Sequence, residues 1–299
     1  MALKNSTRES LAGYLFLLPN FIGFLVFTSI PVVASLGLSF VKWDLLTSPE
    51  FVGLANFAKL FHDMLFWKVC WNTVFLMLGV PIGMMISLGI AVSMNQKLKG
   101  ITIYRTAYFL PTICSGIAIY VLWRYIYNND FGALNFMIRQ FGEMINVPLR
   151  GPNWLLDEHW AKPSLIIMNL WQTVGGPNMI LYLAALQGIP RDYYEAAEID
   201  GANGWQKFWA VTWPMISPTT FFIAIMSVIG GFQAGFDAAY IMTGGGPDHA
   251  TETIMYYIYN NAFEWHQMGY AAAISWVLFL IIFGFTLINW KVGGKVVHY

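Results

Sequence analysis

Six apolar stretches, each long enough to cross a lipid bilayer as a helix, constrain this sequence more than any other feature. A spanning helix needs about 20 mostly apolar residues. Hydrophobic residues make up 57% of the chain and charged residues only 11%, which excludes an ordinary soluble protein. We therefore expect an all-α polytopic membrane protein with six transmembrane helices, in a single domain over residues 1–299. The stretches are 11–40, 72–94, 106–127, 163–186, 218–242 and 269–290.

The distribution of cations predicts how these helices are oriented, because cytoplasmic loops carry an excess of Lys and Arg. With both termini in the cytoplasm, the inner segments hold nine cations in 66 residues and the outer segments hold seven in 97. Lys97 and Lys99 are among the inner cations. This orientation places residues 187–217 in the cytoplasm. The inner segments are 1–13, 95–105, 187–217 and 289–299, and the outer segments are 40–71, 124–163 and 244–268.

Residues 189–218 form the one long amphipathic passage between apolar stretches. Pro190 suits the first position of a helix, and acidic residues follow in its first turns, where they complement the helix dipole. Gly201 can adopt the left-handed conformation that ends a helix. A second amphipathic helix is expected from Asn203 to Trp213, with Pro214 bounding its exit into the next span. An ordinary surface helix in a loop is the alternative interpretation of this passage.

The residues of this passage resemble a known family signature. Glu195-Ala196-Ala197, followed by Gly201 and Pro214, is similar to the EAA motif of ATP-binding cassette (ABC) importer permeases, in the version typical of maltose-type carbohydrate permeases. Trp213 departs from the smaller apolar residue usual in the family. The resemblance implies an EAA coupling loop at 187–217 that docks on an ATPase. The implied coupling residues are Glu195, Ala196, Ala197, Asp200 and Gly201.

The same resemblance implies a function and a set of partners. The chain would be the permease subunit of a binding-protein-dependent importer for a sugar or related polyol in the cytoplasmic (inner) membrane of a bacterium or archaeon. It would work with a second permease subunit, a dimeric ABC ATPase that binds ATP and Mg, and an extracytoplasmic solute-binding protein. Gly53-Leu54, Asn56-Phe57 and the Gly244–Pro247 turn also resemble family elements in outer loops, where turn chemistry alone is an equally good explanation.

Catalysis within this chain is not expected. The sequence has no GxxxxGK phosphate loop and no His, Cys or carboxylate cluster with metal-ligand spacing, so we expect no cofactor, metal site or catalytic residue in it. The formal net charge of zero gives no support to nucleic-acid binding. The two cysteines, Cys70 and Cys114, are better explained as buried thiols than as a disulfide.

Helix breaks beside neutral polar residues indicate where a solute could pass. Pro111, the Gly175–Pro177 segment and Gly230-Gly231 interrupt three spans, and transporters tolerate such breaks where helices line a cavity. Glycines used only for close packing are the alternative. Gly231 and Gly235 are expected to stack on one helix face. The candidate lining residues, partly suggested by the resemblance, are Thr112, Ser115, Gly116, Trp171, Gln172, Thr173, Gly175, Asn178, Gly231, Phe232, Gln233, Gly235 and Asp237.

A self-sufficient secondary transporter or channel is the main alternative function. Asp237 is the only acidic residue expected well inside a span, whereas a proton-driven carrier would be expected to carry several acidic residues or histidines there. A membrane anchor or enzyme that transports nothing is a more distant alternative. The balance of these observations favours the importer permease.

Overall fold

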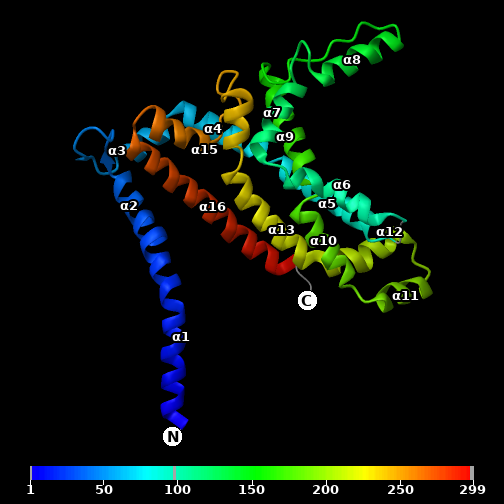
Figure 1. Cartoon of the computed structure of the whole chain (residues 1–299), viewed down its shortest axis with the longest axis horizontal. Coiled ribbons are helices and arrows are strands. Elements are labelled where there is room, and N and C mark those ends of the chain that lie inside the picture. Colours follow the sequence, from blue (N-terminus) through cyan, green and yellow to red (C-terminus); the bar gives the residue numbers. More distant parts are fainter. Residues whose placement is uncertain (1, 97–98, 297–299) are drawn as a thin grey trace. The chain divides into compact units, whose positions relative to one another are not determined.

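A computed structural model describes residues 2–96 and 99–296, with side chains from residue 9 to residue 291 outside that gap (Figure 1). Lys97, counted above among the inner cations, lies outside the described residues. Most of the described chain is helical, as predicted; β1 (Val41–Lys42) and β2 (Glu50–Phe51) form a two-stranded antiparallel ladder. It divides into two compact units, Met1–Asp63 with Ile258–Leu278 and Met64–Tyr257 with Phe279–Tyr299.

The first unit begins with a long helix made of α1 (Ala2–Phe24), the π turn η1 (Leu25–Ser29) and α2 (Ile30–Ser39). None of the residues 9–38 is buried in this chain, so the helix exposes its apolar side chains over these residues. The rest of the unit is compact. Asn56 Nδ2 donates to the carbonyl oxygens of Ser39 and Val41, both at 2.9 Å. The unit also contains α3 (Ala55–His62), η4 (Asn260–Glu264) and the start of α16 (Met268–Val296).

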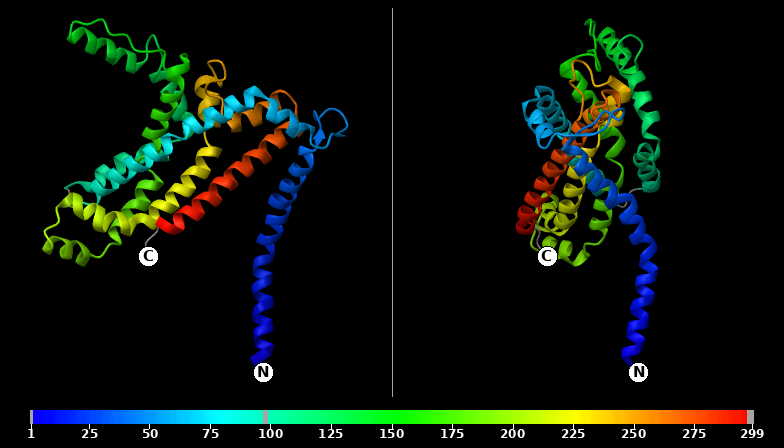
Figure 2. Two further views of the ribbon diagram at one scale, coloured as in Figure 1. Left: turned by 180° about the vertical axis from the view of Figure 1, so that it is seen from behind. Right: turned by 90° about the vertical axis from the view of Figure 1, so that its left-hand side faces the viewer.

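The second unit is a bundle in which α5, α10 and α13 pack on one another (Figure 2). Its core includes Ala91, Met179, Tyr182, Ile216 and Ile223, all nearly inaccessible. The α8 helix extends away from the other helices of this unit in both figures. The helical elements are α4 (Met64–Leu76), α5 (Gly79–Met94), α6 (Ile101–Ile113), α7 (Gly116–Ile126), α8 (Ala133–Met144), α9 (Glu158–Thr173), α10 (Pro177–Gln187), α11 (Arg191–Ile199), α12 (Gly204–Lys207), η2 (Phe208–Thr212), α13 (Trp213–Gln233), α14 (Phe236–Ala238), η3 (Ala239–Thr243) and α15 (Ile254–Tyr259).

The described residues include four unbroken helices that are long and apolar enough to cross a membrane, at Glu9–Leu38, Met64–Met94, Gly204–Gln233 and Met268–Lys291. A fifth crossing is possible if α6 and α7, bent by 95°, form one broken span. The bend lies at Cys114 and Ser115, whose backbone is extended.

The predicted span 163–186 is not one helix. It is divided between α9 and α10 at Gly175-Gly176, where Gly176 is non-helical and Pro177 starts the next helix. Neither piece alone is as long as the four unbroken helices. Breaks therefore divide three of the six predicted stretches, at Cys114-Ser115, at Gly175-Gly176 and at Ala234-Gly235.

Candidate functional site

The predicted short helix in the amphipathic passage is present as α11, and Gly201 ends it as expected. Gly201 has φ +76°, its N–H donates to the Glu198 carbonyl oxygen, and Ala202 N–H donates to that of Ala197. These two hydrogen bonds form a Schellman motif. Pro190 is the N-cap residue rather than the first helical residue, because its ψ of 140° is extended.

Two side-chain contacts fix α11 to the following helix. Tyr194 Oη lies 2.9 Å from Thr212 Oγ1 in a partly buried contact. Lys207 Nζ donates to Glu198 Oε1 at 2.7 Å, and Lys207 is the more buried partner. A capping box between Asn203 and Gln206 starts that helix. The α11 helix is thus held in place from one side only.

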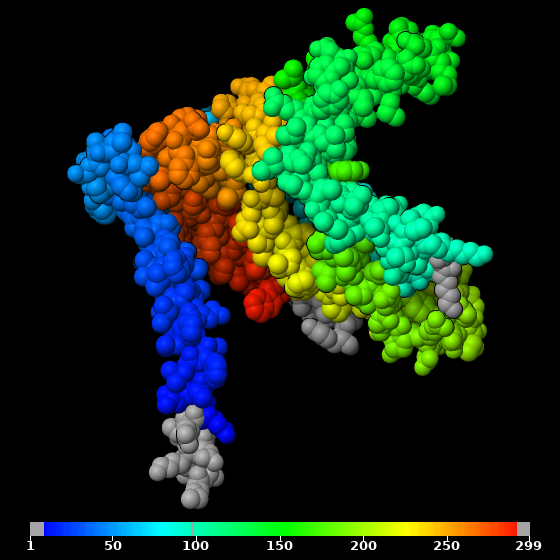
Figure 3. All heavy atoms as spheres, in the orientation of Figure 1, coloured from blue at the N-terminus to red at the C-terminus, as the bar shows by residue number. Residues whose placement is uncertain are grey.

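The opposite side of α11 is exposed at the surface of the second unit (Figure 3). Asp192, Glu195, Ala196 and Ile199 follow a spacing of three, one and three residues, so they share a face. Ile199 is 88% exposed and adds a large apolar side chain to the face that carries Asp192 and Glu195. Sequence analysis did not select Ile199, although its spacing from Glu195 and Ala196 carried the signal.

The second amphipathic helix differs from its prediction. Residues 204–233 form one continuous helix, so the aromatic segment and the fifth predicted span are joined and Pro214 does not end the segment. The π turn η2 lies immediately before α13, and Trp213 N–H donates five residues back, to Phe208. This wider turn changes the hydrogen-bond spacing from four residues to five just before Pro214, which has no N–H to donate.

Tyr194 provides a test of how α11 is anchored. Tyr194→Phe removes the hydroxyl contact with Thr212, and we expect a loss of about 0.5–1.5 kcal/mol in the free energy of unfolding. Thermal unfolding of the detergent-solubilised chain would measure it. Tyr193→Phe is the matched control, because Tyr193 is half-exposed on the same helix. Equal shifts for the two variants would contradict the anchoring role.

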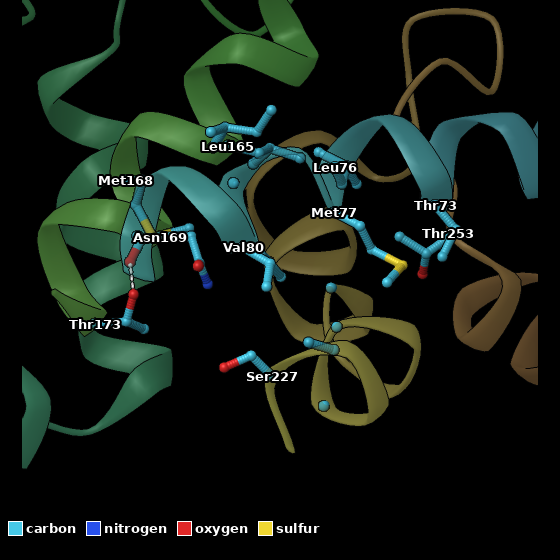
Figure 4. A pocket seen from close by; sticks show the side chains of 18 of the residues that line it. Thr73, Leu76, Met77, Val80, Leu165, Met168, Asn169, Thr173, Ser227 and Thr253 are labelled. Atoms are coloured by element: carbon cyan, nitrogen blue, oxygen red, sulfur yellow. Dashed lines mark hydrogen bonds between the residues drawn. The ribbon is translucent and has the colours of Figure 1, made fainter. Parts of the chain in front are cut away.

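The second candidate site is a cavity of about 350 Å³ within the second unit (Figure 4). It lies between α4, α5, α9, α10 and α13. Apolar side chains such as Met77, Val80 and Leu165 make part of its wall, and Asn169, Thr173 and Ser227 add amide and hydroxyl groups from opposite sides. Among the described residues, none of those lining the cavity is charged.

The structure brings four of the predicted lining residues to this cavity: Thr173, Asn178, Gly231 and Gly235. Asn178 Nδ2 donates to Ser227 Oγ at 3.2 Å, which links α10 to α13 across the wall. Thr173 Oγ1 donates to the Asn169 carbonyl oxygen at 2.8 Å. The Asn169 amide itself has no partner among the described residues, so it remains available to a ligand.

The other predicted residues lie elsewhere. Thr112 Oγ1 donates to the Gln172 carbonyl oxygen at 2.9 Å, and a Cβ at Gly175 would clash with the Tyr108 backbone, so these residues join α6 to the end of α9. Trp171 packs edge-on against Trp123. Phe232 is buried with its ring 5.4 Å from that of Phe285. Ser115, Gly116, Gln233 and Asp237 do not line the cavity either.

Gly231 and Gly235 do not stack on one helix, which corrects the sequence-based expectation. The α13 helix ends at Gln233, Ala234 is extended and Gly235 has φ +91°. That conformation favours glycine, so the residue breaks the helix rather than opening a groove on it. Asp237 follows in the short α14 and is exposed rather than deep inside a continuous span.

The residues that sequence analysis missed come mainly from the predicted second span. Thr73, Met77, Val80 and Ser87 line the cavity together with Gly79 and Gly83. These two glycines are four residues apart, and a Cβ atom at Gly79 or at Gly83 would lie 3.3 Å from the side chain of Ile166 or Leu170, respectively. Their spacing was visible in the sequence, but the helix facing them was not.

The loop after η3 contributes Thr253 to the cavity wall and is held to α4 by hydrogen bonds. Asn72 Nδ2 donates to the carbonyl oxygens of His249 and Glu252, and Ile254 N–H donates to Thr73 Oγ1. Thr73 and Thr253 then both line the cavity. In the exposed part of this loop, Asp248 Oδ2 accepts a hydrogen bond of 2.6 Å from Lys68 Nζ, which lowers the pKa of the Asp248 carboxyl group.

Comparison with known proteins identifies the family of this chain. Residues 79–291 match the family of binding-protein-dependent transport system inner membrane components. The chain belongs to this family. Its relatives are transport permeases, and family membership implies partner subunits.

The similarity covers nearly the whole chain. The probable ABC transporter permease protein YesP of Bacillus subtilis (strain 168) is 40% identical over all of this chain and 96% of its own length. The lactose transport system permease protein LacF of Rhizobium radiobacter is 38% identical over 90% of each chain. A bacterial ABC transporter involved in the import of the acidic polysaccharide alginate shares the fold, with a TM-score of 0.85, 23% identity and full coverage of both chains.

Proposed function

We propose that this importer permease carries a sugar or related polyol through the cavity of its second unit. The observation that carries the proposal is the lining: amide and hydroxyl groups stand among apolar side chains, and no charged side chain lines the cavity within the described residues. Such groups can donate to and accept from solute hydroxyls without favouring an ion. The similarity to the lactose permease LacF supports this substrate class.

Asn169 tests the proposed path. Asn169→Ala removes an amide that no described residue engages, and losing one hydrogen bond costs about 0.5–1.5 kcal/mol, or about two- to tenfold in affinity. We therefore expect sugar uptake at low concentration to fall several-fold. Asn95→Ala, at the exposed C-cap of α5, is the control. Unchanged uptake in Asn169→Ala would remove this residue from the path.

For the partners, we propose that the exposed α11 face docks on a subunit of a dimeric ABC ATPase, which would bind ATP and Mg. The coupling residues remain Glu195, Ala196, Ala197, Asp200 and Gly201, with Ile199 added. The outward-facing apolar helix of the first unit supports a second permease subunit and membrane lipid as further neighbours. An extracytoplasmic solute-binding protein would deliver the sugar. Nucleic acid remains an unexpected partner.

We further propose that both termini and α11 face the cytoplasm, as the cation distribution predicts. Cysteine labelling in a background without Cys70 and Cys114 would test this orientation. Asn203→Cys should react with a membrane-impermeant reagent only after the inner side is opened, and Asn146→Cys should react in intact cells. Reaction of Asn203→Cys from outside would reverse the orientation and remove α11 from the ATPase side.

Energy coupling distinguishes this proposal from a secondary transporter or channel. The chain would be reconstituted in proteoliposomes with its partner subunits and a solute-binding protein, and accumulation of a labelled sugar measured. We expect accumulation only with ATP and the binding protein present. Accumulation by the chain alone, driven by an ion gradient, would favour the secondary transporter.

A further inference from the structure

The first unit contains a cavity that the proposed path does not use. It has a volume of about 750 Å³, within the range of about 300–1,000 Å³ that is usual for small-molecule sites. Residues between Lys42 and Lys59, from β1 to α3, form one wall, and residues 265–270, just before and at the start of α16, form the other. All of its lining residues lie within the same unit.

The walls of this cavity are held by specific contacts. Met268 N–H donates to the Trp43 carbonyl oxygen at 3.0 Å. Lys59 Nζ donates to Gln267 Oε1 at 2.7 Å and lies 4.2 Å from the centre of the Tyr270 ring. Tyr270 Oη donates to Asp63 Oδ2 at 2.6 Å. The cavity therefore exists before any ligand arrives, which lowers the entropic cost of binding.

Two residues at its rim have left-handed backbones although neither is glycine. They are Leu45, with φ 68°, and His266, with φ 52°. Asp44 Oδ1 holds the first of these turns by accepting from Thr47 N–H, Thr47 Oγ1 and Leu46 N–H, and these bonds lower the pKa of Asp44 to about 2. Such conformations persist where the surrounding structure imposes them, and they are concentrated at binding sites.

The cavity presents polar groups that the described chain leaves unpaired. No described residue accepts from Gln267 Nε2, and the side chains of Lys42, Glu50 and His266 have no partner in the described part of the chain. These groups include both donors and acceptors. Two cations and two carboxylates line the cavity, so it favours neither an anion nor a cation.

Two tryptophan side chains also line the cavity. The Trp43 indole is held by a hydrogen bond from its Nε1 to the Thr47 carbonyl oxygen at 2.9 Å. Trp265 lies on the other wall with 43% of its surface exposed. Aromatic faces offer apolar contact to the C–H surface of a sugar ring, while hydroxyls around the ring need mixed donors and acceptors. A neutral saccharide has both features.

We propose that this cavity is a second saccharide site, which takes a neutral oligosaccharide outside the path through the second unit. It rests on the proposed function for its place on the outer side of the membrane and for the choice of ligand class. Trp43 and Trp265 contact the faces of the sugar rings, and Glu50 and Gln267 form hydrogen bonds with sugar hydroxyl groups. A site here would hold solute before it enters the path.

The test separates the two cavities by variants. Full-length chain in lipid nanodiscs would carry Gly230→Leu, chosen to fill the cavity of the second unit. Lactose, raffinose and arabinotriose would each be titrated by saturation-transfer NMR. We expect saturable binding of at least one sugar, at least tenfold weakening by Trp265→Ala, and no change with Trp71→Ala, an exposed tryptophan outside the cavity.

Further variants keep the proposal open to refutation. If Trp265→Ala does not assemble, Glu50→Ala replaces it with the same expectation. Absence of binding by all three sugars, or wild-type binding in the variants, would overturn the second site. A third outcome would also overturn it: the wild-type chain binds a solute-binding protein, Trp265→Ala loses that protein, and sugar binding is unchanged. Sugar uptake without binding here refutes only the second site, and binding here without uptake refutes only the proposed path.

Discussion

Gly230→Leu is expected to reduce sugar uptake more than tenfold while leaving the permease assembled. Gly230 lines the cavity of the second unit, and a Cβ built there has no atom within 4 Å. A side chain added here therefore starts in open space beside the cavity rather than against a neighbour. Leucine also removes a helix-propensity penalty of about 1 kcal/mol at this position in α13. Uptake of labelled sugar and yield of purified complex would be measured together.

Two other glycine variants make this result specific. Gly89→Leu in α5 also adds a side chain in open space, but Gly89 does not line the cavity, so uptake should stay normal. Gly231→Leu would place its Cβ 3.3 Å from Met77 and Val80, so both uptake and assembly should suffer. Normal uptake by Gly230→Leu, at normal yield, would exclude this cavity as the path. Equal loss of yield in all three would indicate packing alone.

Local chemistry explains what the sequence predicted well. Gly201 needs only its own φ and two backbone hydrogen bonds to end α11, and both are set by neighbours in the chain. The helix break at Gly175-Gly176 was also visible, since glycine and proline act on their own turn, whereas α6 continues through Pro111 and breaks at Cys114 and Ser115. The amount of bending was not visible, because the 95° angle between α6 and α7 depends on tertiary packing.

The cavity was harder to predict because a helical period identifies residues that share a face, not the helix opposite. Thr73 and Ser227 lie far apart in the sequence and line one cavity only because α4, α9 and α13 pack together. Gly235 shows a second reason why the sequence was not sufficient. Glycine can allow close packing inside a helix or adopt a left-handed backbone where a helix ends, and only the structure shows that Gly235 does the latter.

The largest expected effect concerns the exposed face of α11. Ile199→Asp should detach the ATPase and abolish uptake, because a large apolar side chain that is 88% exposed in the chain alone has the character of an interface anchor. Glu195→Lys should act similarly. If Glu195 pairs with a cation on the ATPase, removing one partner of a buried pair costs about 3–5 kcal/mol, and a lysine adds repulsion.

Co-purification of the ATPase and ATP-driven uptake would be measured for both variants. Gln187→Lys is the control, because it adds a cation to an exposed position that belongs to α10 and not to α11. Neither variant touches the Tyr194–Thr212 contact or the Lys207–Glu198 bridge that hold α11, so the fold of the second unit should be retained. Normal co-purification and uptake in both would show that α11 is a surface helix without a coupling role. If the ATPase is retained but uptake is lost, other contacts supply the docking energy. The α11 face would then couple ATP hydrolysis to transport rather than bind the ATPase.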